Sequence, residues 1–430
     1  MITRKQVIGH AAASFLYGLV PTSWARRNQT PAQSSSPSDS SDRTVVPTAG
    51  QGVNITSGSV VNSVSGGTAN TILGGGTVTN PLTITGGNDA GTSGSYRVIV
   101  GGYDHLINST GVGADVVGGG AHHRITGTST HGTISGGSYC VISAGDYGSI
   151  GGGTNNAVSA SGATIAGGRT NVAAGQSSTV AGGVGNSALN ANDSISGGIN
   201  NVAGGIASTV GGGNGNRVLG RNGFVGAGGG NTLGVEGTSY GDYSFIGGGF
   251  QNSLGTTSNA RFASIPGGRE CSVQHEYATA SGYHAVTRLP GAEVRASGSF
   301  VRAGDAQVSR LTLRRATTDG VATVLGWNGN AAPPMILTGT TYLLEGTVLA
   351  RRTDQPGANA AWRVSALYAR DGGGARVVGA TVVPLAVEGS ASAWSVTLTA
   401  GNSTVNVNAV GAPGHSIRWV ANVVLTELAQ

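Results

Sequence analysis

The chain repeats a short unit in which one apolar residue is followed, two places on, by a pair of glycines. Between Thr164 and Gly213 the unit reads Thr-Ile-Ala-Gly-Gly, Thr-Val-Ala-Gly-Gly, Ser-Ile-Ser-Gly-Gly and Thr-Val-Gly-Gly-Gly, and each copy begins 15 residues after the previous one. Self-similarity at so short a period is typical of stacked repeats. We expect the apolar residue of each unit to face a common core, which assigns to that core Ile134, Ile150, Ile165, Val180, Ile195, Val210, Ile246 and Ile265.

Each repeat has room for two short β-strands and no helix. A second apolar residue follows seven or eight places after the first, as at Val158, Val172, Val202, Val218 and Leu254. Gly and Asn close the segments, and both tolerate the positive φ that a chain reversing every few residues requires. We interpret the asparagines after each glycine pair as turn residues. The pattern predicts an all-β fold, a Gly-rich β-roll or β-solenoid of about 15-residue coils.

One such coil cannot bury enough apolar surface to fold alone, so the coils must stack. At about 4.8 Å per coil, the usual spacing between strands, the stack from residue 84 to residue 268 would be a rod roughly 60 Å long. The glycine pair leaves no side chain at one corner of each coil. We expect another backbone to approach there, and identical coils from other chains are the natural candidates.

The regularity of the repeat changes along the chain and divides it into segments. The expected segments are residues 1–27 as an N-terminal anchor helix or signal-like segment, 28–44 as a flexible Ser/Pro linker, 45–90 as capping repeats, 91–274 as the repeat shaft, 275–303 as a transition segment and 304–430 as a C-terminal domain. Residues 1–27 start with basic residues and continue with an apolar run that is too short to span a bilayer. A secretory signal and an amphipathic docking helix both fit this layout.

The last 125 residues or so have a different composition. Four of the five tryptophans lie there, and the glycine pairs give way to alternating strands joined by Gly, Pro and Asp turns. This pattern predicts an antiparallel β-sandwich. The strands are expected at residues 342–349, 362–368, 376–385, 393–398, 404–410 and 417–425. A segment of this size is long enough to hold its own core.

Composition narrows the possible partners. The chain has 78 Gly and only 10% charged residues, and its net charge of +5 comes from 23 Arg and a single Lys. Because no basic stripe follows the repeats, we expect no nucleic-acid partner. Cys140 and Cys271 lie in distant coils, so we expect neither a disulfide between them nor a metal site at them.

Several histidines and carboxylates collect near the start of the shaft. His105, His122, His123 and His131 lie there with Asp104 and Asp115. These are metal-ligating residue types. Adjacent residues such as His122 and His123 point to opposite faces of a strand, so we favour turn residues on a solvated flank and expect no metal and no cofactor.

Aromatic residues enter the longer repeats near the end of the shaft. Exposed rings beside a carboxylate are a common way to hold a sugar, and packing of the longer loops onto the shaft is the alternative for the same residues. The possible receptor or glycan contacts in the chain are Tyr240, Asp242, Tyr243, Phe250, Trp327 and Trp362.

A glycan-cleaving enzyme would need two carboxylates about 5 to 10 Å apart in a groove. The regular repeats between residues 150 and 220 contain one acid, Asp193. The remaining candidate pairs are Asp104 with Asp115, Glu236 with Asp242, and Glu270 with Glu276, and none lies in a catalytic motif. The sequence also contains neither a phosphate-binding loop in context nor a nucleophile elbow. We therefore expect no enzymatic activity.

Two parts of the chain resemble known families. The glycine-closed repeats from residue 64 to residue 286 resemble the head of YadA-type trimeric autotransporter adhesins, which implies a homotrimer of β-rolls. The C-terminal segment resembles the terminal β-domain of tailed-phage tail fibre and tail spike proteins, which implies a domain that caps the fibre, trimerises it or contacts the host. That second resemblance rests on residues 304–310, 313–319, 349–354, 361–362 and 417–421.

These expectations combine into one functional hypothesis. The protein is expected to be a homotrimeric virion fibre or spike, bound to tail or capsid proteins through its N-terminus and attached to a glycan or protein receptor on the host surface. One alternative is a glycan-degrading tail spike depolymerase. The other is a bacterial surface adhesin, secreted or cell-bound, although the last residues do not resemble a membrane anchor domain.

Overall fold

A computed structural model describes residues 113–330 and 332–430, together with seven strands before them. The chain divides into two units, residues 1–41 and 42–430, and the described residues belong to the second. The early strands are β1 (Thr44–Val45), β2 (Asn54–Ile55), β3 (Ser63–Ser65), β4 (Asn70–Ile72), β5 (Leu82–Gly86), β6 (Ser95–Ile99) and β7 (His105–Ser109). The predicted anchor and linker, and most of the predicted capping segment, lie outside the described residues.

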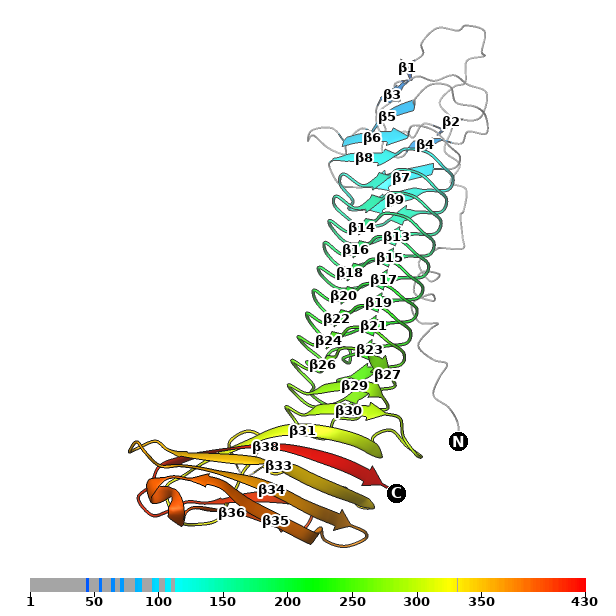
Figure 1. The fold of residues 1–430 in the computed structure, drawn as a ribbon. Helices are drawn as coiled ribbons and strands as arrows, with labels where there is room; N and C mark the ends of the chain where they lie inside the picture. The colour runs from blue at the N-terminus through cyan, green and yellow to red at the C-terminus, as the bar shows by residue number, and fades with distance from the viewer. Residues whose placement is uncertain are drawn as a thin grey trace. The chain divides into compact units, whose positions relative to one another are not determined.

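The shaft is a solenoid whose coils contribute strands to two parallel sheets (Figure 1). One sheet continues from β6 through β8 (Ala114–Val117), β10 (Thr133–Ile134), β12 (Ser149–Ile150), β14 (Thr164–Ile165), β16 (Thr179–Val180), β18 (Ser194–Ile195), β20 (Thr209–Val210), β22 (Phe224–Val225), β24 (Phe245–Ile246), β26 (Ser264–Ile265), β27 (Gly268–Arg269), β29 (Thr279–Tyr283) and β30 (Glu293–Ser297). Equivalent residues pair between neighbouring coils, as Ile165 does with Val180. The predicted all-β solenoid is confirmed.

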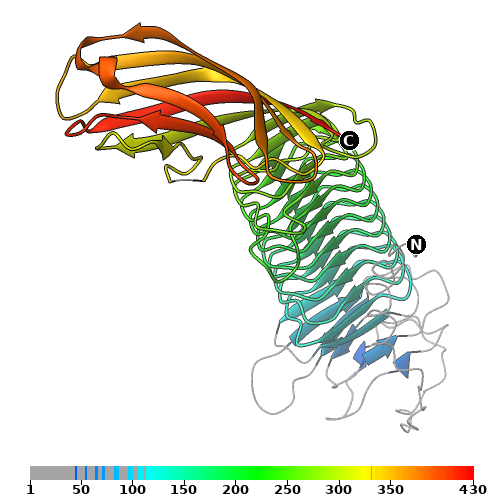
Figure 2. The same cartoon turned by 90° about the horizontal axis from the view of Figure 1, so that it is seen from below.

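The second sheet of the shaft runs alongside the first (Figure 2). It continues from β7 through β9 (Arg124–Gly127), β11 (Val141–Ile142), β13 (Ala157–Val158), β15 (Val172–Ala173), β17 (Ser187–Ala188), β19 (Val202–Ala203), β21 (Arg217–Val218), β23 (Thr232–Leu233), β25 (Ser253–Leu254) and β28 (Ser272–Val273). The segment predicted as a transition, residues 275–303, contains β29 and β30, which pair in parallel and add further coils to the stack.

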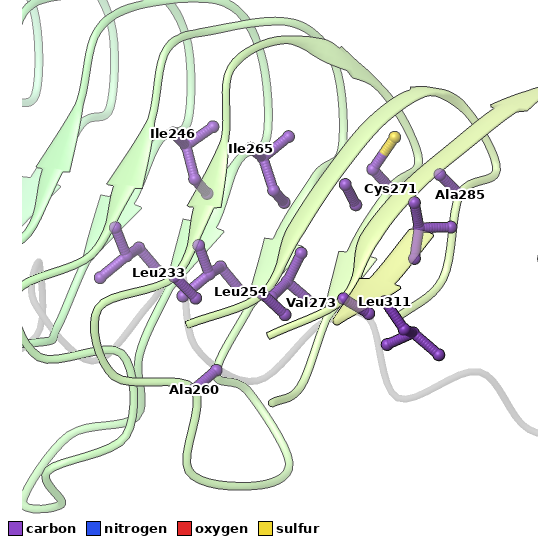
Figure 3. Packing of buried hydrophobic residues seen from close by; sticks show 14 of the residues in the cluster. Leu233, Ile246, Leu254, Ala260, Ile265, Cys271, Val273, Ala285 and Leu311 are labelled. Carbon is purple, nitrogen blue, oxygen red and sulfur yellow. The ribbon is translucent and has the colours of Figure 1, made fainter. Parts of the chain in front are cut away.

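Two rows of apolar side chains fill the space between the sheets. The eight residues assigned to the core are all completely buried. In Figure 3, Ile246 and Ile265 form one row, and Leu233, Leu254 and Val273 form the other. The second row corrects part of the sequence interpretation, because Val172 and Val202 are only half-buried and the alanine after each one faces the core. Only the position eight residues after the first apolar residue points inward.

The C-terminal segment begins by pairing with the last coil. Strand β31 (Ala306–Thr317) is antiparallel to β30 and starts a sheet in the order β31, β38 (Ile417–Ala429), β33 (Thr340–Arg352), β34 (Asn359–Arg370) and β35 (Arg376–Val387). A second sheet contains β32 (Thr323–Val324), β37 (Val405–Val410) and β36 (Ser395–Ala400), and a 3₁₀ helix, η1 (Gly389–Ala393), precedes β36. The six predicted strands are present, whereas β31 and β32 were not predicted.

The tryptophans build the core between these two sheets. The ring of Trp419 lies 5.6 Å from that of Trp362 and 5.9 Å from that of Trp394, between ring centroids. The buried indole N–H groups find partners, as such groups usually do: Trp419 donates to Thr317 Oγ1 at 2.9 Å and Trp394 to His415 Nδ1 at 3.1 Å. No helix in the described part of the chain is long and apolar enough to cross a membrane.

Candidate functional site

Every coil turns twice, and at each turn one residue takes a left-handed backbone conformation. In the coil that starts at β14, these residues are Thr170, with φ of 57°, in the turn after the glycine pair, and Ser177, with φ of 56°, in the turn that leads to the next coil. We call the first the inner turn and the second the return turn. Equivalent residues of successive coils form a column along each turn, which is where the larger side chains of this shaft appear.

The return-turn column ends in three stacked aromatic rings at Tyr243, Phe262 and Tyr277. Their ring centroids are 5.2 and 5.4 Å apart, their planes differ by 10° and 5°, and the residues remain 50%, 45% and 60% exposed. The Arg261 guanidinium lies 5.3 Å from the centroid of the Phe262 ring, within the range of a cation–π contact. We call these three rings the aromatic column.

The backbone geometry does not require aromatic residues at these positions. Earlier coils place Ser177, Asn192 and Ala207 in the same column with nearly the same positive φ. A left-handed conformation costs a residue other than glycine about 1–2 kcal/mol, and the fold would be served as well by Gly or Asn. The aromatic column is therefore a feature of the surface rather than a requirement of the coil.

A second group of large side chains lies on the inner-turn side of the same coils. Arg269 lies between two rings, with its guanidinium carbon 5.8 Å from the Phe250 centroid and 5.2 Å from the Tyr283 centroid. Its Nε donates to the Glu270 carboxylate at 3.0 Å. Hydrogen bonds from His284 first, and then from Arg269, hold the pKa of Glu270 below its usual value, so this carboxylate is charged at neutral pH.

The structure divides the predicted receptor contacts into exposed and buried residues. Tyr243 and Phe250 are exposed, and Tyr240 and Trp327 are partly buried. Asp242 is only 5% exposed and accepts the backbone N–H of Arg221 at 2.8 Å, while Trp362 is 4% exposed in the sandwich core. The last two side chains are occupied inside the protein and are not available to a ligand. Phe262 and Tyr277 also belong to the exposed aromatic column, although the sequence analysis did not predict them as receptor or glycan contacts.

The third residue after each glycine pair in the regular coils is an asparagine, and it is not a turn residue, which corrects the sequence interpretation. These asparagines are completely buried and form a ladder through Asn156, Asn171, Asn186, Asn201, Asn216 and Asn231 to Asn252. Each side-chain oxygen accepts the backbone N–H of the next asparagine, and each side-chain amide donates to carbonyls of its own and the next coil. The residue before the asparagine carries the positive φ, as Thr170 does before Asn171.

The histidine cluster continues this ladder toward the N-terminus. His105 Nδ1 accepts the N–H of His123 at 3.3 Å, and His123 Nδ1 accepts the N–H of Cys140 at 3.2 Å. Burial first, and then the neighbouring His105, lower the pKa of His123 to about 4, so this imidazole is neutral at neutral pH. His122 and His131 instead stack on Tyr139 and Tyr147 in the turns. Among the described residues, no group of His, Cys, Asp or Glu has the arrangement of a metal site.

The two cysteines occupy ladder positions in their coils. Both are buried and free of disulfides, and burial raises the pKa of each thiol. Cys140 lies between His123 and Asn156 in the ladder, and the N–H of Cys271 donates to Asn252 Oδ1 at 3.0 Å. Each therefore fills a small buried site at one end of the asparagine series.

The acids of the candidate carboxylate pairs differ in burial or lie at different turns wherever both are described. Asp104 lies outside the described residues, and Asp115 is buried with its oxygens taken by Ser109, Ser129 and the Gly132 N–H. Glu236 is exposed while Asp242 is buried. Glu270 bonds Arg269 and His284 at an inner turn, whereas Glu276 accepts a bond from Asn259 beside a return turn.

Asp193, the one acid of the regular repeats, has a structural role. Its carboxylate accepts the Ser208 N–H and hydroxyl at 3.0 and 2.8 Å and the Asn190 N–H at 2.8 Å. Burial raises its pKa in spite of these hydrogen bonds.

Comparison with known proteins gives distant likenesses only. No family model and no curated protein sequence matches the chain. Solved structures that match include the tailspike protein of Acinetobacter baumannii phage AM24, with 10% identity, a TM-score of 0.21, and 91% of this chain and 74% of that chain covered. The tailspike of Acinetobacter baumannii bacteriophage Fri1, described as a capsular polysaccharide depolymerase, matches with 8% identity, a TM-score of 0.20, and 88% and 82% coverage.

The tailspike protein of Acinetobacter phage vB_ApiP_P1 matches with 12% identity and a TM-score of 0.25, over 90% of this chain and 80% of that one. Likenesses with such low TM-scores carry no weight for this chain's function, and its solenoid is established by its own strand pairing. The resemblance of the repeats to YadA-type heads stays a prediction.

Proposed function

We propose that the protein is a virion fibre or spike that attaches to the host surface by binding a glycan. The observation that carries this proposal is the aromatic column, in which three rings stack in the open on one edge of the shaft. A sugar ring presents a face of C–H groups that packs on an aromatic ring. Polar groups lie in the same turns. The Asn259 amide donates to the Glu276 carboxylate at 2.8 Å, and the Arg261 guanidinium lies over the Phe262 ring.

The resemblance of the C-terminal segment to tail fibre domains supports the virion setting. The structure adds that this segment pairs directly with the shaft, because β31 continues the sheet of β30 and Arg288 of the shaft pairs with the buried Glu427 at 2.8 Å. The glycosidase alternative has less support, since Asp242 is buried while Glu236 is exposed, and Glu270 and Glu276 lie at different turns with partners of their own.

The glycan proposal predicts that removing the central ring weakens attachment. Phe262→Ala deletes the ring that contacts both Tyr243 and Tyr277. We expect affinity for a bound glycan to fall about tenfold, which corresponds to about 1.4 kcal/mol and is the order of one aromatic contact. Binding would be measured on immobilised capsular and lipopolysaccharide glycans.

A matched control is Phe224→Ala. Phe224 is also exposed and stacks on Phe245 at 5.5 Å, but it lies in β22 on the outer face of a sheet rather than in a return turn. Equal losses for the two variants, or no loss for Phe262→Ala, would remove the aromatic column as the binding surface.

The homotrimer is proposed on the geometry of the glycine pair. The second glycine is needed within one chain: Gly168 has φ of +90°, and a Cβ there would lie 2.2 Å from the Gly183 carbonyl oxygen. The first glycine is not needed in every coil. A Cβ on Gly167 or Gly182 would meet nothing within 4 Å, whereas Gly197 and Gly212 have φ of 151° and 155°, which favours glycine within one chain. We attribute the glycines at 167 and 182, which their own chain does not require, to the close approach of a neighbouring chain.

Gly182→Leu is accordingly expected to weaken the trimer while leaving the coils folded. We expect dissociation at a concentration at least about tenfold higher than for the unchanged protein, because a leucine side chain would separate backbones in close contact, and a tenfold change corresponds to about 1.4 kcal/mol. Light scattering over a concentration series measures this. Gln176→Leu, which places the same side chain in an exposed return turn, is the control. A monomer before any substitution would end the trimer proposal.

A further inference from the structure

We propose that Ser299, His284 and Glu270 form a nucleophile, base and positioning acid that hydrolyse small carboxylic esters, such as O-acyl groups on sugars. For its natural substrate this inference rests on the proposed glycan-binding function. The chemistry itself rests on the three side chains. Glu270 and His284 are equivalent inner-turn positions of successive coils, because Arg269 pairs with Tyr283. Tyr283 pairs in turn with Ser297, so Ser299 lies in the next coil, one residue past the position equivalent to His284.

The His284 imidazole lies within hydrogen-bond distance of both the Ser299 hydroxyl and the Glu270 carboxylate, as a base between a nucleophile and a positioning acid must. Ser299 Oγ lies 2.5 Å from His284 Nδ1, and His284 Nε2 lies 2.7 Å from Glu270 Oε2. With the imidazole proton on Nε2, where Glu270 accepts it, the Nδ1 lone pair is directed at the serine hydroxyl. A nucleophile bonded to a base that a third group orients is the general arrangement of activated serine hydrolases, here with the two ring nitrogens exchanged relative to serine proteases.

The surroundings hold the charge and the nucleophile in place. Arg269 Nε bonds the other oxygen of Glu270 at 3.0 Å, which keeps that carboxylate oriented and ionised. The chain after Ser299 is fixed by the buried Asp305, whose carboxylate accepts the backbone N–H groups of residues 300, 301 and 302 at 2.9, 2.6 and 2.8 Å. Such pre-organisation is what distinguishes a reactive serine from a mobile surface hydroxyl.

The end of the stack also leaves a donor for the developing negative charge. In the coils below, the residue of the inner-turn column donates its N–H to the preceding coil, as His284 does to the Arg269 carbonyl at 3.0 Å and Glu270 to the Phe250 carbonyl at 2.8 Å. The N–H of Ser299, which lies one residue past the equivalent position of the last coil, makes no backbone bond within the described chain and can donate to an oxyanion. A hollow of about 380 Å³, lined by the next residue, Phe300, with Thr341, Asp371 and Leu428, adjoins this turn and has room for a sugar unit.

The reaction uses only the ester and water. Ser299 Oγ attacks the ester carbonyl carbon while its proton passes to His284 Nδ1. The tetrahedral intermediate expels the alcohol, which takes that proton and leaves an acyl-serine. Water then loses a proton to His284 Nδ1 and attacks the acyl carbon, and collapse of the second intermediate releases the carboxylic acid and returns the proton to Ser299 Oγ. Glu270 accepts the Nε2–H throughout and neutralises the imidazolium.

The test uses the full chain and two probes, 4-nitrophenyl acetate for turnover and a fluorophosphonate for covalent labelling. We expect the label on Ser299, located by peptide mass spectrometry, and hydrolysis to fall about 100-fold or more in Ser299→Ala and in His284→Ala. Glu270→Gln is expected to lower the rate less and to move the acid limb of the pH profile to lower pH, because the imidazole acts as a base only when deprotonated and its protonated form loses its charged partner. Ser297→Ala, an exposed serine in β30 two residues away, is the control.

Each result decides the proposal. Absence of label on Ser299, or hydrolysis in Ser299→Ala equal to that of the unchanged protein, overturns it. Hydrolysis lost in His284→Ala but kept in Ser299→Ala overturns it as well, because the histidine would then act alone. Unchanged melting curves for the variants show that the coils are intact. Glycan binding by Ser299→Ala is measured separately, so a failed esterase and a failed attachment function are told apart.

Discussion

Replacing Ile195 by aspartate is expected to abolish the cooperative unfolding transition of the shaft. Ile195 is completely buried in β18 and lies between Val180 and Val210 of the neighbouring coils. Ile195→Asp removes an apolar side chain whose loss alone costs about 2–5 kcal/mol and places a carboxylate where no partner exists, which costs several kcal/mol more. Whole domains are stable by only about 5–15 kcal/mol.

The damage is expected to spread from one coil along the stack. In a solenoid each coil contacts only its neighbours, so a failed coil divides the shaft into two shorter stacks that must fold alone. Circular dichroism on heating would measure the lost transition, and limited proteolysis would show cleavage around residue 195. Ser196→Asp is the matched control, because Ser196 is the next residue and is exposed. If Ile195→Asp melts like the unchanged protein, the core assignment fails.

The apolar period made the shaft predictable, since a 15-residue spacing of Ile and Val leaves few alternatives to stacked coils. It did not resolve which of two neighbouring apolar residues faces the core. Val172 and Val202 look more like core residues than Ala173 and Ala203, yet the alternation of side chains in a strand places the alanines inside. Composition does not show which of the two neighbouring residues faces the core, and only the register of the strand determines it.

The candidate site was partly predictable for a similar reason. Tyr243 and Phe250 were recognised as aromatic residues in longer repeats, but nothing in the sequence separated them from Trp362, which the sandwich buries. Ser299, His284 and Glu270 are common polar residues without a motif. They come together only because the stacked coils place Glu270 beside His284 and bring Ser299, one residue past the equivalent position of the next coil, within reach of the same imidazole, and that alignment requires the register of the last coils.

The asparagine ladder was misread because Asn after Gly has two physical uses. Asn tolerates positive φ in a turn, and its amide can also replace backbone partners inside a protein. A sequence signal did exist, because Asn156, Asn171, Asn186, Asn201 and Asn216 recur at exact 15-residue spacing. Turn positions in the same coils are filled loosely by Asn155, Thr170, Gly185, Asn200 and Gly215. Strict identity at one position and variation at its neighbour distinguish a buried ladder from a turn.

Asn201→Ala is therefore expected to destabilise the shaft by about 3 kcal/mol or more. The Asn201 amide donates to the Gly197 and Gly213 carbonyls at 2.9 and 3.0 Å, and its oxygen accepts the Asn216 N–H at 2.9 Å. The substitution leaves the Gly197 carbonyl and the Asn216 N–H without partners, at a cost of about 1–3 kcal/mol each, and leaves the Gly213 carbonyl with the Ile199 N–H alone. Denaturant unfolding followed by circular dichroism gives the change in the free energy of unfolding.

Two further variants distinguish the loss of the ladder hydrogen bonds from a general sensitivity of this turn to substitution. Asn200→Gly changes the preceding exposed residue, whose φ of 54° suits glycine, and is expected to change stability by less than about 0.5 kcal/mol. Asn201→Asp keeps the shape but turns a carboxylate toward two carbonyl oxygens, so its folded-state pKa is raised and its stability should fall as the pH rises from acid to neutral. If Asn201→Ala were as mild as Asn200→Gly, the ladder would be a consequence of stacking rather than one of its causes.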